Sequence, residues 1–187
     1  MERKKIFYSI AAVLMFASFT AYSFIYTDKP NDTPKYVGAE KCAGACHKSE
    51  SQGNQYGIWK GTKHSKAFET LTTEAADKIV KEKGILTPAS ESPECLKCHT
   101  TQADASSMLE TFNVKDGVQC ETCHGPGSEY KTISIMKDKE KAVSNGLVIH
   151  TEKEIFCIKC HNAESPTFTG FSYDVYWEKV KHMRPAK

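Results

Sequence analysis

Neither sign of charge dominates this sequence of 187 residues, in which 25 Lys and Arg stand against 23 Asp and Glu, for a formal net charge of +2. It lacks a basic stripe and an acidic tail, so its composition implies no nucleic-acid partner. Hydrophobic residues make up 40%, too few for a polytopic membrane protein, and charged residues make up 26%. These values exclude a collagen-like or fully disordered chain and are ordinary for a globular protein of one domain or two small ones.

The long apolar run lies at the N-terminus. Three basic residues in the first five precede an apolar stretch from Ile6 to about Phe19, which continues more weakly to Tyr26. A basic segment before an apolar one is typical of a secretory signal, and we expect residues 1–23 to be a cleaved signal peptide. The alternative is an uncleaved membrane anchor to about residue 26, since residues 6–26 are just long enough to span a bilayer. Both readings predict export to the periplasm or the exterior of the cell envelope.

The cysteines occur in pairs, and the second member of every pair is followed directly by histidine. The pairs are Cys42/Cys46 before His47, Cys95/Cys98 before His99, Cys120/Cys123 before His124, and Cys157/Cys160 before His161. Cys-x-x-Cys-His is the attachment signature of c-type haem, in which the thiols add to the porphyrin vinyl groups and the histidine ligates the iron. Four disulfides, a zinc ribbon or a thioredoxin-type motif does not require histidine after each pair. We therefore predict four covalently bound haems c.

The first motif departs from this spacing. Cys42-Ala-Gly-Ala-Cys46-His47 has three intervening residues, and Gly44 between two alanines makes the longer loop sterically easy. We interpret it as a fourth haem site. The alternative is a disulfide between Cys42 and Cys46, or an inactive motif.

Three histidines remain outside the motifs: His64, His150 and His182. We expect them to be distal iron ligands, which gives three bis-histidine haems and one haem without a histidine partner. His150 has the alternative of being a surface residue. The odd haem is either five-coordinate or ligated by a methionine, and Met108, Met136 and Met183 are the candidates outside the signal.

Removal of the signal leaves roughly 40 residues per haem, too few for a conventional core. We therefore expect a mainly α fold, with short helices and loops wrapped around four covalently bound haems and little β-structure. Residues 24–35 form a linker and residues 36–187 the tetrahaem domain. Helical segments are predicted as a broken helix over 50–70 and helices over 74–83, 129–145 and 173–183, with a turn or two over 103–109. Very short strands are expected at Val118 and at 148–149.

Three stretches carry a resemblance to a known family. They are Tyr36–Lys41 before the first motif, Trp59–Ala67 with His64, and Gly117–Gly127 with the sequence His-Gly-Pro-Gly. In these the chain resembles the cytochrome c-554 family of tetrahaem cytochromes. The resemblance implies haems in closely stacked pairs, and three bis-histidine irons with one five-coordinate iron, usually the second, here that of His99. It also implies His64 and His182 as distal ligands.

The function indicated is electron transfer between redox partner proteins through four haems. The alternative is a haem enzyme that acts on nitric oxide, nitrite or hydroxylamine at the five-coordinate haem, although no catalytic base or substrate pocket is marked in the sequence. A third interpretation is a structural or sensory subunit of a larger respiratory complex. Whichever interpretation holds, the N-terminal segment is a candidate membrane anchor.

Overall fold

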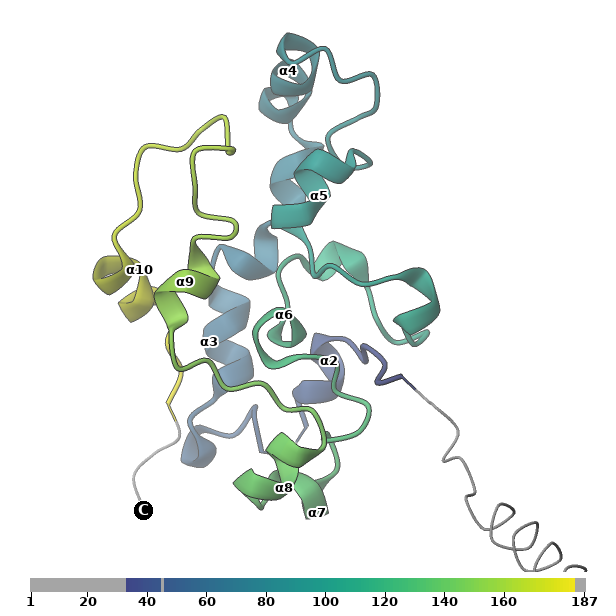
Figure 1. Cartoon of the computed structure of the whole chain (residues 1–187), viewed down its shortest axis with the longest axis vertical. Coiled ribbons are helices and arrows are strands. Elements are labelled where there is room, and N and C mark those ends of the chain that lie inside the picture. The colour runs from purple at the N-terminus through teal and green to yellow at the C-terminus, as the bar shows by residue number, and fades with distance from the viewer. Residues whose placement is uncertain (1–32, 45, 184–187) are drawn as a thin grey trace, which may run out of the picture. The chain divides into compact units, whose positions relative to one another are not determined.

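The protein is described by a computed structural model, which covers residues 33–44 and 46–183. The predicted signal and nearly all of the predicted linker lie outside these residues. Helices joined by long loops make up the described part (Figure 1). The α-helices are α2 (Ala39–Cys42), α3 (Gln55–Gly61), α4 (Glu74–Glu82), α5 (Pro93–His99), α6 (Cys120–His124), α7 (Ile133–Met136), α8 (Lys139–Ser144), α9 (Lys153–Cys157) and α10 (Tyr173–Val180). Short 3₁₀ turns lie at Glu50–Gln52, His64–Lys66, Glu69–Thr72, Ala105–Ser107 and Val114–Asp116.

The mainly α prediction is confirmed, whereas the predicted short strands do not form. Pairing of β type within the described residues is limited to an isolated parallel bridge between Tyr36 and Met108. The amide of Val118 instead donates to the carbonyl of His64 at 3.0 Å, and that of Val148 to the carbonyl of His124 at 2.9 Å. Each of these two segments is therefore hydrogen-bonded to the backbone of a histidine, His64 or His124, and the two do not pair with each other.

Helix α4 matches its predicted span because both of its end signals are local. The Thr73 side chain accepts a hydrogen bond from the amide of Ala76 at 3.3 Å, which caps the N-terminus. Gly84, just beyond the C-terminus, has a φ of 69°, a left-handed conformation that glycine adopts without strain. The buried face of the helix packs Val80 against Leu71 and Ala89.

The predicted helix over 129–145 is wrong in two respects, because helix begins only at Ile133 and forms as two helices, α7 and α8. Asp138 separates them, and its side chain accepts from the amide of Lys141 at 2.9 Å, so it caps α8. A short carboxylate side chain that bonds to nearby amides competes with helix continuation. The predicted end at Asn145-Gly146 is confirmed, with Gly146 at φ 99°.

The last helix is also shorter than predicted. Helix α10 ends at Val180, where the following amide of Lys181 still donates to the carbonyl of Trp177 at 2.8 Å. His182 therefore lies in the extended segment after the helix and not on it. The predicted broken helix over 50–70 is observed as α3 and a series of 3₁₀ turns.

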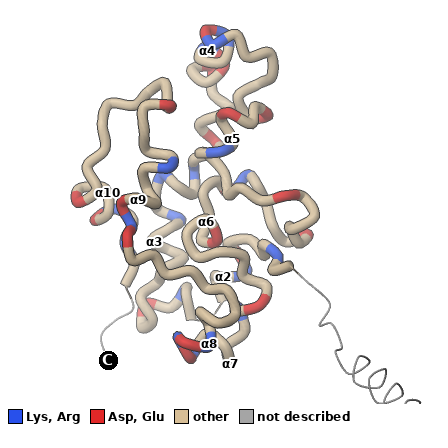
Figure 2. Tube along the Cα trace, viewed as in Figure 1, with Lys and Arg blue, Asp and Glu red and all other residues tan. Residues whose placement is uncertain are grey.

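Charge is scattered along the chain, with neither sign gathered on one element (Figure 2). Within residues 33–44 and 46–183, no helix has both the length and the apolar character needed to cross a membrane.

Candidate haem-attachment sites

Short helices position the cysteine pairs. Helix α5 contains the whole second motif and α6 the whole third, so the two cysteines of each lie one turn apart with the histidine next to the second. The first cysteine of the other two motifs, Cys42 and Cys157, is the last residue of α2 and α9 respectively. Each motif therefore offers two thiols and an imidazole from one compact segment.

The thiols of different motifs meet in two couples. The neighbouring Cys120 thiol, followed by burial, raises the pKa of the Cys42 thiol, whereas Cys42 lowers the pKa of Cys120 against the opposing effect of burial. Burial and the neighbouring Cys98, which also shares a hydrogen bond, raise the pKa of Cys160 to about 12. All eight cysteines are free of disulfides. The first motif therefore lies near the third, and the second near the fourth. The third motif is also near the fourth, since Cys157 contributes to the raised pKa of Cys123.

Two of the candidate distal histidines face motif histidines. The ring centroids of His64 and His161 lie 6.0 Å apart, and those of His124 and His182 lie 6.1 Å apart. Two imidazoles bound to one metal through nitrogens at about 2.0 Å place their ring centroids roughly 6 Å apart. Both pairs thus have the spacing that one iron between them requires.

Hydrogen bonds to backbone carbonyls orient three of the histidine rings through Nδ1. Nδ1 of His99 lies 2.8 Å from the carbonyl oxygen of Ala67, Nδ1 of His124 lies 3.2 Å from that of Val148, and Nδ1 of His182 lies 3.0 Å from that of Val180. A carbonyl only accepts, so each Nδ1 carries the proton and leaves Nε2 for a metal. Metal-bound histidines in proteins are usually oriented by such a bond.

His47 and His150 are placed differently. Nδ1 of His47 lies 3.3 Å from the Gln55 side-chain oxygen. Nε2 of His150 lies 2.9 Å from the carbonyl of Cys123, and its ring stacks on Phe156 with centroids 4.1 Å apart. Among the described residues, neither histidine forms a ring pair with another histidine, so His150 is not brought to a motif histidine in the way His64 and His182 are.

The neutral form of three of these imidazoles is favoured by partial removal from water. Burial lowers the pKa of His161, and it lowers the pKa of His64 together with the nearby charge of His161. The pKa of His124 is also lowered, mainly by burial, against the opposing effect of its bond to Val148. The neutral imidazole is the form that binds a metal, so the donor set suits iron at neutral pH.

Methionine ligation of the odd haem finds no direct support. Met108 takes part in the backbone bridge to Tyr36, and the side chain of Met183 is 69% exposed. Helix α7 ends at Met136.

Sequence reasoning missed a buried polar cluster between the first and third motifs. Glu121, inside the third motif, is 1% exposed and accepts from the amide of Gly127 at 2.7 Å. A side chain at Gly127 would begin 3.1 Å from that carboxylate and 3.2 Å from Val37. At Gly127 the observed neighbours are a carboxylate and a valine. No pattern of spacing could have revealed this contact.

The apolar residues after position 130 are largely exposed in the polypeptide. Between residues 131 and 183 only Ala142 is a buried hydrophobic residue. The exposed large hydrophobic residues there are Ile133, Val143, Val148, Ile149, Ile155, Ile158, Phe168, Val175, Tyr176 and Met183. Such a segment needs a large apolar partner, and a porphyrin is one. The donor set, the ring spacing and these exposed side chains therefore fit attached haem.

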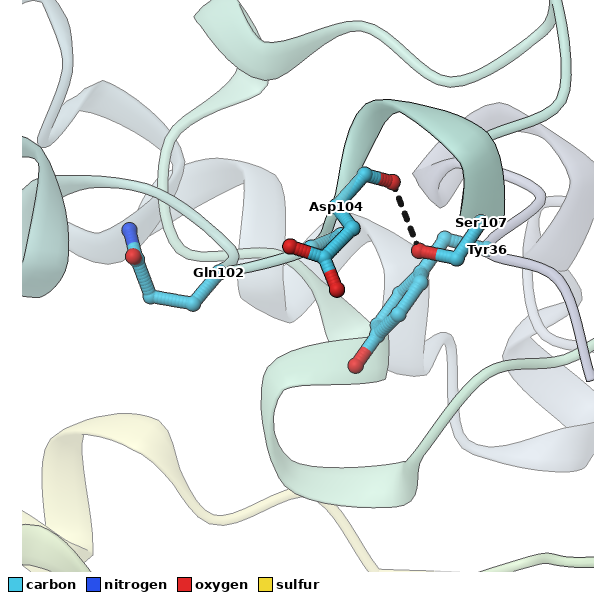
Figure 3. Close-up of a pocket in the computed structure, with 5 residues that line it drawn as sticks. Tyr36, Gln102, Asp104 and Ser107 are labelled. Atoms are coloured by element: carbon cyan, nitrogen blue, oxygen red, sulfur yellow. Dashed lines mark hydrogen bonds between the residues drawn. The ribbon is translucent and has the colours of Figure 1, made fainter.

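Other kinds of site fit less well. The described residues contain no cluster of three or more His, Cys, Asp or Glu side chains suited to a bare metal ion. An open hollow of about 280 Å³ lies beside Tyr36, Gln102, Asp104 and Ser107 (Figure 3). Its lining contains neither a cysteine nor a histidine, so it lies apart from the chemistry of the motifs.

These attachment motifs, with their oriented histidines, define a c-type cytochrome. A family model described as cytochrome c554 and c-prime matches residues 41–125, a range that contains the first three motifs. A relative, cytochrome c-554 of Nitrosomonas europaea, is 34% identical over 106 residues, which are 54% of this chain and 42% of the relative. Over these residues the chain is similar to the cytochrome c-554 family, the family that the motifs led us to expect. It matches less than half of that relative's length, and no solved structure matches it.

Proposed function

We propose that this chain is an exported c-type cytochrome that carries four haems and transfers electrons between redox partner proteins. The observation that carries the proposal is the proximity of motifs that are far apart in the sequence. Cys120 of the third motif packs against the cluster that contains Ala39 of α2, the helix that ends at Cys42 of the first motif, and Sγ of Cys160 in the fourth motif lies 4.0 Å from the carbonyl oxygen of Lys97 in the second. Cofactors attached at adjoining sites can exchange electrons. Haem c, when bound, supplies an iron that alternates between the ferric and ferrous states.

The chain's own residues bind and orient the cofactors. The eight motif cysteines hold them covalently, and His47, His99, His124 and His161 are the proximal ligands. His64 and His182 serve the irons of His161 and His124, which is supported by the ring spacings of 6.0 and 6.1 Å. A second imidazole closes the iron to small molecules, which suits a carrier. His150 is the remaining distal candidate.

The number of haems is tested by the intact mass of the purified holoprotein. We expect the polypeptide plus four haem masses. A variant with Cys42→Ala and Cys46→Ala should carry three, because the first motif is then lost. A wild-type protein with three haems would show that the longer first motif is not used.

The ligand assignment is tested by His64→Ala. This variant should convert one haem from low spin to high spin in the EPR spectrum while all four stay attached. The matched control is His150→Ala, which tells whether the third spare histidine has the same role. An unchanged low-spin count in His64→Ala would remove His64 from the ligand set.

A second function is an enzyme acting on nitric oxide, nitrite or hydroxylamine at the haem of His99. This function is favoured by the number of histidines, because the three outside the motifs leave one of the four proposed haems without a distal histidine. In the described part of the chain His99 has no histidine ring partner, and its Nδ1 lies near Ala67 and Thr70. Addition of nitric oxide or cyanide should then perturb one haem in four. Turnover above ordinary electron exchange, lost on removal of that haem, would be needed to establish catalysis.

We also propose that the protein works in the periplasm, with residues 1–23 as its signal, a linker over 24–35 and the tetrahaem domain over 36–187. The family relation and the need to attach haem outside the cytoplasm support this. N-terminal sequencing of the mature protein tests it. A start at Phe24 would indicate cleavage, and a start at Met1 in the membrane fraction would indicate an anchor.

A further inference from the structure

Glu121 is a carboxylate buried between two haem-attachment motifs. It accepts from the amide of Val37 at 2.8 and 3.1 Å, from that of Gly38 at 2.8 Å and from that of Gly127 at 2.7 Å. Both of its oxygens therefore act as acceptors of backbone N–H groups. Within the described residues, none of the salt bridges formed by Lys, Arg or His includes it. Its partners are dipoles, which stabilise a negative charge without cancelling it.

The position of this carboxylate relates it to the first and third motifs together. Glu121 directly follows Cys120 in α6, and Val37 and Gly38 lead directly into α2, whose last residue is Cys42. The Cys42 thiol lies 3.9 Å from the carbonyl oxygen of Gly38. The amides that Glu121 binds thus belong to the segment that places the first motif against the third.

Two ionisable groups lie close enough to Glu121 for a charge on it to affect them. The pKa of the Cys42 thiol is raised by its hydrogen bond to Cys120 and by burial, and the charge of Glu121 adds to this rise. The pKa of Tyr130 is raised by burial, and again Glu121 contributes. A charge in a low-dielectric interior acts over longer distances than one in water.

The other couple of motifs has a different electrostatic setting. The carboxylates near the second and fourth motifs, Glu94 and Glu164, are exposed, and Glu164 is paired with Lys97. Exposed charges are screened by solvent and salt. The described residues place no buried carboxylate there.

We propose that Glu121 is a fixed negative charge that lowers the reduction potentials of the haems attached through the first and third motifs. This inference rests on the proposed function, because it requires haems at both motifs. A ferric centre is more positive than a ferrous one by one charge, so a nearby buried anion stabilises the oxidised form. Glu121 is thus a positioning residue for Val37 and Gly38 and an electrostatic one for this couple of haems.

The test is spectroelectrochemical titration of the holoprotein bearing Glu121→Gln, which keeps the shape of the side chain and removes its charge. Two of the four reduction steps should move to higher potential while the other two stay in place. Glu121→Asp, which keeps the charge, should leave the potentials closer to those of the wild type than Glu121→Gln does.

The matched control is Gln119→Met in the same buried cluster. Gln119 is 2% exposed, accepts from the amide of Ala39 at 2.8 Å and donates to the carbonyl of Asn113 at 2.8 Å. Its replacement removes hydrogen bonds to the same segment without changing charge, so stability should fall while the potentials stay in place. Equal shifts in both variants, a uniform shift of all four steps, or no shift in Glu121→Gln would overturn the inference.

An exposed variant covers the case in which Glu121→Gln does not load its haems. Lys131 is exposed, and its charge opposes that of Glu121 at Cys42. Measured at low ionic strength, where an exposed charge is least screened, Lys131→Met should move the same two steps to lower potential, and a shift of the other two steps instead would overturn the inference. The wild-type mass separates the two proposals, because fewer than four haems contradicts the proposed function, whereas four haems with insensitive potentials contradicts only this inference.

Discussion

Residues 34–130 and residues 131–183 differ in how they bury their side chains. The first region contains two clusters of buried hydrophobic residues, one around Leu71 and Val80 and one around Tyr56 and Trp59. The second contains a single buried hydrophobic residue, Ala142, and most of the exposed large hydrophobic side chains of the described chain. The polypeptide supplies its own core in the first region, whereas the second depends on what is attached to it.

The largest effect should follow from removal of the fourth attachment site. In a variant with Cys157→Ala and Cys160→Ala, we expect residues 131–183 to lose protection from hydrogen exchange, because they have almost no polypeptide core. Residues 34–130 should stay protected. An equal loss of protection in both regions would show that residues 34–130 depend on the attached cofactors as much as residues 131–183 do, which would contradict the difference described above.

The next effect concerns the core of the first region. Trp59 is 7% exposed, and its indole N–H donates to the carbonyl of Val118 at 2.8 Å. Trp59→Ala should lower the free energy of unfolding by about 3–5 kcal/mol. Leu86→Ala is the matched control, since Leu86 is fully exposed, and it should change that free energy by about 0.5 kcal/mol or less. Chemical denaturation of the holoproteins measures both.

A smaller effect should appear at alkaline pH. Burial, followed by the hydrogen bond to Glu40, raises the pKa of Tyr56 from 10.0 to about 12. The folded protein keeps a proton that the unfolded chain releases, so this stabilisation is complete below pH 10.0 and is lost as the pH rises to about 12. Tyr56→Phe should therefore gain stability relative to the wild type over that range. Parallel unfolding curves for the two proteins would contradict it.

The smallest effect is expected at the surface pair between Lys97 and Glu164, which joins the second motif to the segment after the fourth. The two side chains are 48% and 68% exposed. Exposed pairs contribute little and are screened by salt. Lys97→Met should therefore barely change the thermal midpoint, and any change should vanish at high salt. A large, salt-independent loss would mean that this pair, and not attached haem, organises the second and fourth motifs.

Several elements were predictable because their signals are local. The helix from Glu74 was recognisable from its threonine cap and terminal glycine, and the attachment motifs from the order of cysteine and histidine. The break at Asp138 was missed because the sequence pattern alone does not show whether an aspartate continues a helix or caps a new one. The structure shows that the Asp138 side chain bonds to the amide of Lys141 and caps α8. The strands expected at Val118 and Val148 failed because their amides bond to histidine-bearing turns far along the chain.

The sequence by itself determined which thiols and imidazoles are available, in what order, and that three histidines lie outside the four motifs. Tertiary structure alone decided the pairing. It brought His64 to His161 and His182 to His124, joined the first motif to the third, and turned Glu121 inward. The physical reason is that attachment depends on neighbours along the chain, whereas ligation, packing and the field of a buried charge depend on residues brought together only by folding.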